Sequence, residues 1–271
     1  MFQSKTKQIA AVVAAGTAAV AIAACGGSGD AEGESTANVS SAKGTTSAGS
    51  ALPQGTERVK LDPAEFTTKI DNLYWPMSPG SRWVYRESDT TGTKERVVVE
   101  VTDKTKTIAN GVEAVVVRDT VSDAATGDPL EVTDDWYAQD ANGNIWYLGE
   151  DTAEYENGKI ANRSGSFEAG IDGAQAGIAL PANPEPGMEY RQEYYEGEVE
   201  DEGAIVTVGE EQVQVPFGHF DEGVLMTRDL VPTEPKVQEL KFYVPDVGPV
   251  LSVHTDGVGG RGELVSYEPG R

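Results

Sequence analysis

Cysteine and histidine are almost absent from this chain of 271 residues, which has one cysteine, Cys25, and two histidines, His219 and His254. A tetrahedral zinc site takes several such ligands, so we expect no metal centre of this kind and no other cofactor. No cysteine follows Cys25, so the rest of the chain forms no internal disulfide and depends on its core. A G-x-S-x-G elbow is missing, and each histidine fits a strand or turn better than a Ser-His-carboxylate site. The sequence therefore favours a protein that is not an enzyme.

Positive charge is also scarce. The chain has 21 Lys and Arg residues against 45 Asp and Glu residues, which gives a formal net charge of −24 at pH 7. An acidic surface repels phosphate backbones, so we expect no nucleic acid among its partners. With this many carboxylates, some pair will lie at the separation that a glycosidase needs by chance, and their spacing along the chain says nothing about that activity.

The first residues have the layout of a signal peptide. Lys5 and Lys7 are the only charges before residue 30, and the chain from Ile9 to Ala24 is almost wholly apolar. A membrane-spanning helix needs about 20 apolar residues, whereas this run is shorter and ends in small residues, as a cleavage site requires. We therefore predict a signal peptide over residues 1–24, whose removal would change the net charge from −24 to −24 − 2 = −26.

The sequence IAAC at residues 22–25 resembles the lipobox of bacterial lipoproteins. The resemblance implies cleavage before Cys25, a diacylglycerol on its sulfur, and a further acyl chain such as palmitate on the freed amine. Two or more chains anchor a protein stably in a membrane. The protein would then lie on the extracytoplasmic face of the cell envelope, anchored through Cys25. The alternative is an ordinary secretory signal with an incidental cysteine.

Two regions follow the signal peptide. Residues 25–57 are dominated by Gly, Ser, Ala and Thr with almost no large apolar side chain, which predicts a lipidated cysteine on a disordered tether. Residues 58–271 are predicted to form a single acidic antiparallel β domain. Asp62 as N-cap, Pro63 at the first helical position and Glu65 in a capping box predict one short helix at its start.

The rest of the domain has the period of two, the β-branched and aromatic residues and the regular turns that are typical of strands. We expect an all-β fold, a strongly curved antiparallel sheet that forms a half-barrel or a sandwich. The predicted strands are 82–87, 95–102, 112–121, 130–139, 144–148, 189–195, 204–208, 212–217, 224–230, 237–244, 250–255 and 263–267.

Three tight hairpins are predicted, at residues 142–143, 209–210 and 245–248. A two-residue turn at the first would place Ala138 opposite Tyr147, with Trp136 and Tyr147 on the same face of the sheet. Large aromatic residues on both faces imply that both faces are covered. Residues 169–187 are too long for a simple loop in a compact domain, and we considered both a lid over an open end of the sheet and a structural plug or crossing connection.

Two segments resemble a broad group of bacterial envelope lipoproteins and exported β domains, namely YWPMSPGSRWVY at 74–85 and FYVPDVGPV at 242–250. The resemblance implies a strongly bent antiparallel sheet or half-barrel and no chemistry. Met77, where leucine is common, and Pro249, where an aliphatic residue usually continues the strand, depart from the pattern. Pro249 predicts an edge or a bulge.

Candidate binding residues are aromatic. Trp75, Trp83, Tyr190, Tyr194 and Tyr195 would line a pocket for an apolar or sugar ligand, although such residues in a cysteine-free β domain more often belong to the core. Our leading hypothesis is a non-enzymatic domain that binds a small molecule, a lipid or an envelope protein.

Two alternatives stay open. One is a hydrolase that acts on a cell-wall or extracellular polymer through carboxylates. The other is a calcium-stabilised surface module, for which we considered the acidic run at 193–203, with a solvated face as its simpler explanation. The string DANGN at 140–144 has its glycine at the wrong position for an EF-hand, and a hairpin explains it without metal.

Overall fold

The computed structural model describes residues 51–232, 236, 238–255 and 260–271. Cys25, the predicted signal peptide and most of the predicted tether lie outside the described residues. Nowhere in the described part of the chain is there a helix with the length and hydropathy needed to cross a membrane.

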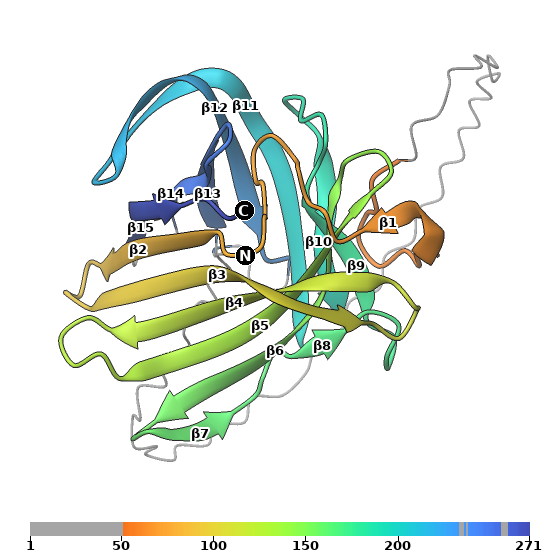
Figure 1. The fold of residues 1–271 in the computed structure, drawn as a ribbon, viewed down its shortest axis with the longest axis horizontal. Coiled ribbons are helices and arrows are strands. Elements are labelled where there is room, and N and C mark those ends of the chain that lie inside the picture. The colour runs from red at the N-terminus through yellow and green to blue at the C-terminus, as the bar shows by residue number, and fades with distance from the viewer. Residues whose placement is uncertain (1–50, 233–235, 237, 256–259) are drawn as a thin grey trace, which may run out of the picture. The chain divides into compact units, whose positions relative to one another are not determined.

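Antiparallel strands make up nearly all of the regular structure (Figure 1). The elements are η1 Pro63–Glu65, β1 Phe66–Thr67, β2 Arg82–Asp89, β3 Lys94–Thr107, β4 Glu113–Asp123, β5 Pro129–Asp140, β6 Ile145–Glu156, β7 Lys159–Asn162, β8 Phe167–Glu168, β9 Gln175–Leu180, β10 Glu189–Tyr195, β11 Val199–Val215, β12 Gly218–Leu230, β13 Gln238–Val244, β14 Gly248–His254 and β15 Gly260–Glu268.

The sheet closes on itself. Strands are paired in the order β5-β4-β3-β2-β15-β14-β13-β12-β11-β10-β9-β6, and β6 pairs back onto β5, so twelve strands form a closed barrel. The all-β class is confirmed, but the half-barrel and the sandwich are wrong. Local alternation cannot reveal the closure, because it depends on β9, which joins β6 to β10 and lies within the segment that we did not predict as a strand.

The predicted short helix is a single 3₁₀ turn. Asp62 caps it as expected, since its Oδ1 accepts a hydrogen bond of 3.0 Å from the amide of Ala64, and Pro63 is its first residue. The chain leaves the turn at Phe66 in an extended conformation and pairs with β5. Pairing with the barrel therefore ends the helix after one turn.

The predicted hairpin at residues 209–210 is also wrong. Strand β11 runs through this region without turning, and its register against β12 shifts between Val208 and Glu211. Gly209, with φ of +79°, lies in this irregularity. Here the glycine permits a β-bulge rather than a turn, and the hairpin lies at residues 216–217 instead.

The hairpin between β5 and β6 exists, but its register differs by one residue from the prediction. Tyr137 lies opposite Tyr147, and Ala138 lies opposite Trp146. Only Gly143 of the predicted turn has positive φ, and its amide donates to the carbonyl of Asp140, so the loop is longer than two residues. A shift by one residue exchanges the faces of a strand, so Tyr137, not Trp136, shares the inner face with Tyr147.

The third hairpin, between β13 and β14, is confirmed. Asp246 and Gly248 take positive φ in its turn, and the amide of Val247 donates to the carbonyl of Val244 over 3.1 Å. The bulge predicted from Pro249 is also present, since the register of the two strands shifts beside it.

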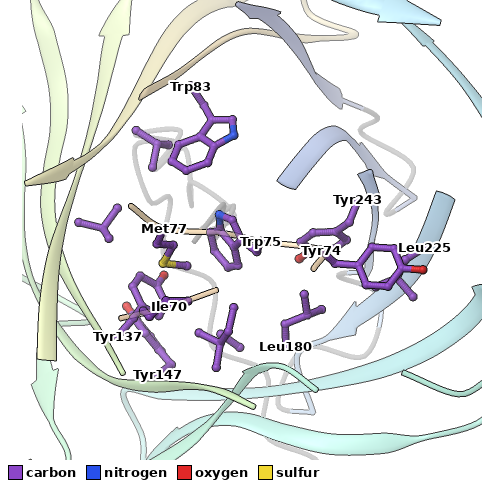
Figure 2. Close-up of a cluster of buried hydrophobic side chains, with 14 of the residues drawn as sticks. Ile70, Tyr74, Trp75, Met77, Trp83, Tyr137, Tyr147, Leu180, Leu225 and Tyr243 are labelled. Atoms are coloured by element: carbon purple, nitrogen blue, oxygen red, sulfur yellow. The ribbon is translucent and has the colours of Figure 1, made fainter. Parts of the chain in front are cut away.

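A short irregular segment fills one part of the barrel. Ile70, Tyr74, Trp75 and Met77 lie in the buried core together with inward-facing strand residues (Figure 2). The Trp75 ring lies 5.5 Å from the ring of Tyr137 between centroids. We call residues 70–77 the plug. The motif YWPM thus supplies the interior packing of the barrel, where large apolar side chains exclude water.

A second apolar cluster covers the outside of the same wall. Trp136 and Leu148 belong to it, and Val59, Leu61 and Phe66 from the start of the domain pack against it. The two clusters confirm the prediction that both faces of the sheet are covered.

Two segments that we did not predict as part of the barrel wall either belong to it or bind to it. Residues 175–180 form β9, a strand of the barrel wall whose side chains are buried or half-buried, so they are neither a lid nor a plug. Residues 52–57, assigned to the tether, are held by the guanidinium of Arg191, which donates to the carbonyls of Gly55, Glu57 and Ala176 over 2.6 to 3.2 Å. The structured domain therefore begins before residue 58.

Candidate functional site

The five aromatic residues proposed to line a pocket lie in different environments. Trp75, Trp83 and Tyr190 are buried in the core, with exposed fractions of 3%, 1% and 1%. Tyr195 packs against the same core from a half-buried position, whereas Tyr194 lies outside that cluster. Trp83 also has its own partner, since its Nε1 donates to the carbonyl of Val247 over 2.7 Å. Four of the five therefore lie in the core or pack against it.

The structure brings polar residues together that the sequence analysis did not single out. Asp135 on β5 and Glu150 on β6 are opposite each other, with exposed fractions of 2% and 3%. The hydroxyl of Tyr147 lies 2.7 Å from Oδ1 of Asp135 and 2.8 Å from Oε2 of Glu150. Tyr147 belongs to the barrel core, so both carboxylates face the interior. A phenol has one proton, so it donates to one of these carboxylates at a time.

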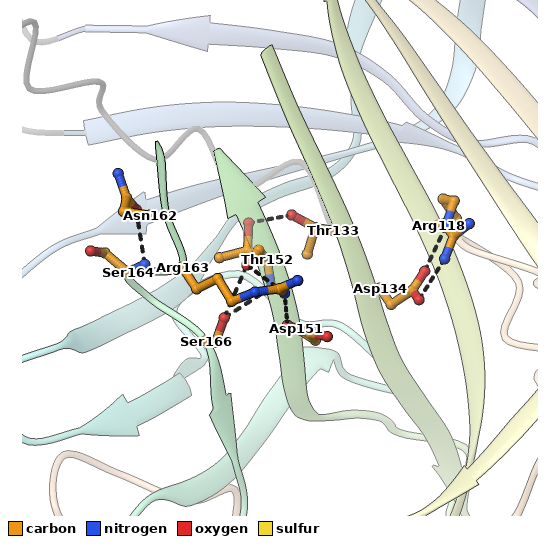
Figure 3. A network of polar contacts seen from close by, with 9 residues as sticks. All are labelled: Arg118, Thr133, Asp134, Asp151, Thr152, Asn162, Arg163, Ser164 and Ser166. Atoms are coloured by element: carbon orange, nitrogen blue, oxygen red, sulfur yellow. Dashed lines mark hydrogen bonds and ion pairs between the residues drawn. The ribbon is translucent and has the colours of Figure 1, made fainter. Parts of the chain in front are cut away.

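The neighbouring carboxylates on the same strands face outward and are paired with arginine (Figure 3). Asp134 accepts two hydrogen bonds from Arg118, over 2.6 and 2.7 Å. Asp151 accepts one from Arg163. Consecutive residues of a strand point to opposite faces, so each strand has an arginine-paired acid on the outside next to a buried acid on the inside.

The opposite wall contributes a second group of charges. Nζ of Lys241 lies 2.5 Å from Oδ2 of Asp229 and 3.3 Å from Oε2 of Glu239. His254 Nε2 lies 3.7 Å from Oε1 of Glu239. Lys241 is two residues from Tyr243 of the barrel core, so this group also faces the interior. Burial opposes the charge on Lys241, but Asp229 and Glu239 raise its pKa well above the ordinary value.

Glu193 on β10 and Asp201 on β11 are paired across their strands. They connect the pair of Asp135 and Glu150 with the group of charges around Lys241. Burial raises the pKa of Asp201 to about 6, a hydrogen bond with Glu193 opposes the shift, and the charge of Asp229 adds to it. Burial likewise raises the pKa of Asp119 on β4 well above its usual value, and nearby Asp135 adds to that effect.

We refer to this set of inward-facing residues as the acidic layer. It consists of Asp119, Asp135, Glu150, Glu193, Asp201, Asp229 and Glu239, together with Lys241.

Polar atoms at the acidic layer lack partners within the protein. Oδ1 of Asp119 and the hydroxyl of Tyr137 are both buried without a hydrogen bond, and their residues have exposed fractions of 9% and 0%. Burial raises the pKa of Tyr137 well above its usual value, and the charges of Asp135 and Glu150 add to the shift, which places its hydroxyl beside the layer. Buried polar atoms are nearly always hydrogen-bonded in proteins, so these two are exceptions among the described residues.

The described residues contain no group of three or more His, Cys, Asp or Glu side chains arranged to hold a metal ion. In the string DANGN, Asp140 is already occupied, because it accepts hydrogen bonds from the amides of Asn142 and Asn144, from the Asn144 side chain and from Nε1 of Trp146. These bonds explain the motif by turn formation alone.

The acidic run at residues 193–203 is not wholly a solvated face, because Glu193 is buried. One signal in the sequence could have shown this. In the strand sequences TDDWY and ELKFY, an acidic residue lies two positions before a residue that faces the interior. Residues two apart in a strand point to the same face, so these acids are predicted to face the core and not the solvent. His219 and His254 both lie in strands, on β12 and β14, as expected.

No protein-family model and no curated protein matches the chain. Two solved structures match it in part. One, described as a "putative lipoprotein" from Parabacteroides distasonis ATCC 8503, has 15% sequence identity and a TM-score of 0.39, over 73% of this chain and 99% of that chain. The other, described as a "putative exported protein with YmcC-like fold" from Bacteroides fragilis NCTC 9343, has 17% identity and a TM-score of 0.40, over the same shares of the two chains.

Proposed function

We propose that this protein is a lipid-anchored, extracytoplasmic binding protein whose barrel holds a ligand at the acidic layer. The lipobox at residues 22–25 supports the anchor and the location. The interior of the barrel supports the binding function. A barrel of this size can enclose a small ligand among its inward side chains.

The observation that carries the binding function is the pair of buried, unpartnered atoms, Oδ1 of Asp119 and the hydroxyl of Tyr137. A buried polar group without a partner costs about 1 to 3 kcal/mol of folding free energy. A protein that needed only a stable fold would lose nothing by having apolar residues at these two positions. A bound ligand would supply the missing hydrogen bonds and offset the cost.

The hydrolase is the weaker alternative. Asp135 and Glu150 approach a common phenol closely enough for the carboxylate spacing of a retaining glycosidase, which is about 5 to 5.5 Å. Both are almost fully buried, however, so they are not exposed in a cleft that a polymer chain could enter. Their contact with Tyr147 fits a binding layer better than a cleft for a polymer.

The anchor is tested by a Cys25→Ser precursor produced in the native host and labelled with radioactive palmitate. The variant should lose the label and leave the membrane fraction, while the wild-type chain keeps both. A variant that still carries the label would contradict the anchor.

Binding is tested by native mass spectrometry of the full-length protein purified from its own host. The spectrum should show the chain with an added small-molecule mass, and that mass should disappear from the Tyr137→Phe variant. A chain that is always free of ligand, in the presence of host extract, would contradict the binding function.

Thermal melting with and without a chelator tests the calcium-stabilised module. An unchanged melting midpoint would contradict that module.

A further inference from the structure

We propose that residues 209–223, the end of the long hairpin formed by β11 and β12, are a hinged arm that covers one end of the barrel and opens as a unit. An open arm would give access to the interior, which the proposed binding function requires. The inference itself concerns motion only, and its test needs no ligand. The pairing of the arm, the irregularity of its base and the contacts of its tip support it.

The arm extends beyond the paired wall of the barrel. Strand β10 pairs with β11 over residues 199–204, and β13 pairs with β12 over residues 225–230. Past these residues the two strands continue together as a curved hairpin (Figure 1). In the part of the chain that the structure describes, no third strand pairs with residues 209–223. Movement of the arm would therefore break no ladder between the strands of the wall.

The base of the arm is irregular in both strands. The register shifts between Val208 and Glu211 and again between Glu211 and Val213. Gly209 on β11 and Gly223 on β12 have positive φ, at +79° and +68°, beside these shifts. Bulges interrupt the ladder and bend a strand. The base thus resembles a hinge, in which a few residues absorb a change in φ and ψ.

The charge of the base also disfavours a regular ladder. The two irregular stretches, 209–212 and 221–223, contain no lysine or arginine but four acids, which are Glu210, Glu211, Asp221 and Glu222. Like charges on neighbouring strands repel each other and weaken strand pairing. Electrostatic repulsion therefore opposes the conversion of this base into rigid sheet.

The tip of the arm contacts a distant strand. Strand β11 contacts β14 and β15, although β12 and β13 lie between them in the wall. The amide of Phe217 donates to the carbonyl of Leu264 on β15 over 3.0 Å, and the Phe217 ring meets that of Tyr267 edge-on, with 6.5 Å between centroids. This part of β15 is open to the arm because β14 pairs with residues 260–263 only. The edge of β15 therefore holds the closed position.

The inner face of the arm is apolar. Val213 and Val215, each 3% exposed, belong to the barrel core, and Phe220 packs against that core. Gln212 and Gln214 alternate with the two valines and are exposed. Burial of the apolar face favours the closed arm, so the open arm would be a minor state. An arm that opens at its base would expose both valines together.

The experiment measures the reactivity of single buried thiols. Cys25→Ser leaves a chain without cysteine, into which Val215→Cys or Ile205→Cys is introduced. The two positions are on β11 and are 3% and 2% exposed, but Ile205 lies in the wall. The full-length variants are incubated with iodoacetamide, and alkylation is followed by mass spectrometry. Val215→Cys should react at least about tenfold faster than Ile205→Cys, because a local opening needs less free energy than unfolding of the barrel.

The urea dependence of the alkylation rate distinguishes local opening from unfolding, because it increases with the surface that is exposed. Low concentrations of urea should hardly change the rate for Val215→Cys and should raise it steeply for Ile205→Cys. Val213→Cys should react as fast as Val215→Cys, since both inner positions move with the hinge.

A further substitution tests the contact that closes the arm. Phe217→Ala, added to the Val215→Cys chain, should raise the alkylation rate about fivefold, as the loss of one aromatic contact predicts. Phe217 is 38% exposed, so its truncation leaves the core intact. Gln212→Ala, on the exposed face of the arm, is the matched control and should not change the rate.

Two results would overturn the inference. Equal rates and equal urea dependence for Val215→Cys and Ile205→Cys would mean that the arm moves only when the barrel unfolds. Fast alkylation of Val215→Cys with slow alkylation of Val213→Cys would show fraying of the tip instead of motion at the hinge. Neither result concerns a ligand, so native mass spectrometry tests the proposed binding function separately.

Discussion

Lys241 and Asp229 form an ion pair inside the barrel, with 2.5 Å between Nζ and Oδ2 and with side chains that are 4% and 11% exposed. Lys241→Met would leave Asp229 and Glu239 facing each other without the ammonium group that lies between them. Removing one partner of a buried pair typically costs about 3 to 5 kcal/mol, because the remaining charge stays desolvated. Urea denaturation at pH 7 should show a loss of this size in the free energy of unfolding.

Lys69→Met is the matched control, because Lys69 forms an ion pair with Asp71 in which both side chains are largely exposed. Surface pairs contribute about 0 to 1 kcal/mol. Equal effects of the two substitutions would show that Lys241 is solvated and that the interior layer is not desolvated.

The plug should contribute strongly to stability. Trp75→Ala would leave a cavity between Tyr137 and Tyr243, whose rings lie 5.5 and 6.2 Å from that of Trp75. We expect a loss of about 3 to 5 kcal/mol in the free energy of unfolding. Leu73→Ala, in the same segment at 52% exposure, should change it by less than about 0.5 kcal/mol. A small effect of Trp75→Ala would mean that the plug is not part of the core.

Arg191 should control the local order of residues 52–57. A lysine has all its donors on one nitrogen and lacks the planar fork with which the guanidinium reaches the carbonyls of Gly55, Glu57 and Ala176, so Arg191→Lys should release the segment while the barrel stays folded. Trypsin should then cut after Arg58 faster than in the wild-type protein, as measured by mass spectrometry over a time course. Arg163→Lys, on the outside of the barrel, serves as the control. Unchanged cleavage at Arg58 would argue that other contacts hold the segment.

The ligand-free protein should lose stability as the pH rises from 4 to 6. The pKa of Asp201 is about 6 in the folded protein against 3.8 for an ordinary aspartate, because burial disfavours its charge. In this window the folded state binds more protons than the unfolded state, so the free energy of unfolding falls as the pH rises, by on the order of 2 kcal/mol. Asp119 and Glu239, whose pKa values are also raised, act in the same direction.

Chemical denaturation at several pH values checks this dependence. Asp201→Asn should reduce the slope between pH 4 and 6. Asp123→Asn should leave it unchanged, because the pKa of that exposed carboxyl is lowered by backbone amides and its protonation falls below pH 3.8. Stability that stays constant or rises across the window would contradict the assigned burial of the layer.

Local patterns in the sequence predict the strands better than they predict the site. Strand β10 was predicted with its observed ends, and β2, β13 and β14 within two residues, because alternation and turn chemistry are local. The register at Gly143 was wrong by one residue, because the hydrogen bonds of Asp140 lengthen the loop. The bulge at Gly209 was wrongly predicted as a turn, because a glycine with positive φ is typical of both β-bulges and tight turns.

The site depends on contacts between distant parts of the chain. Asp135 and Glu150 are acidic residues in an acidic protein, and only the corrected register places them on the inner face with Tyr147. Closure of the ring through β9 then brings Glu193 to the same interior. Predicting the site would have required knowledge that β6 pairs with β9, and the Gly- and Ala-rich sequence of β9 does not indicate a strand.

The account depends most on whether the interior of the barrel holds a ligand. A crystal structure of the full-length protein purified from its own host tests this directly. We predict a bound molecule inside the barrel that makes a hydrogen bond with Asp119 Oδ1 or with the hydroxyl of Tyr137. An interior filled by protein side chains alone would contradict the account.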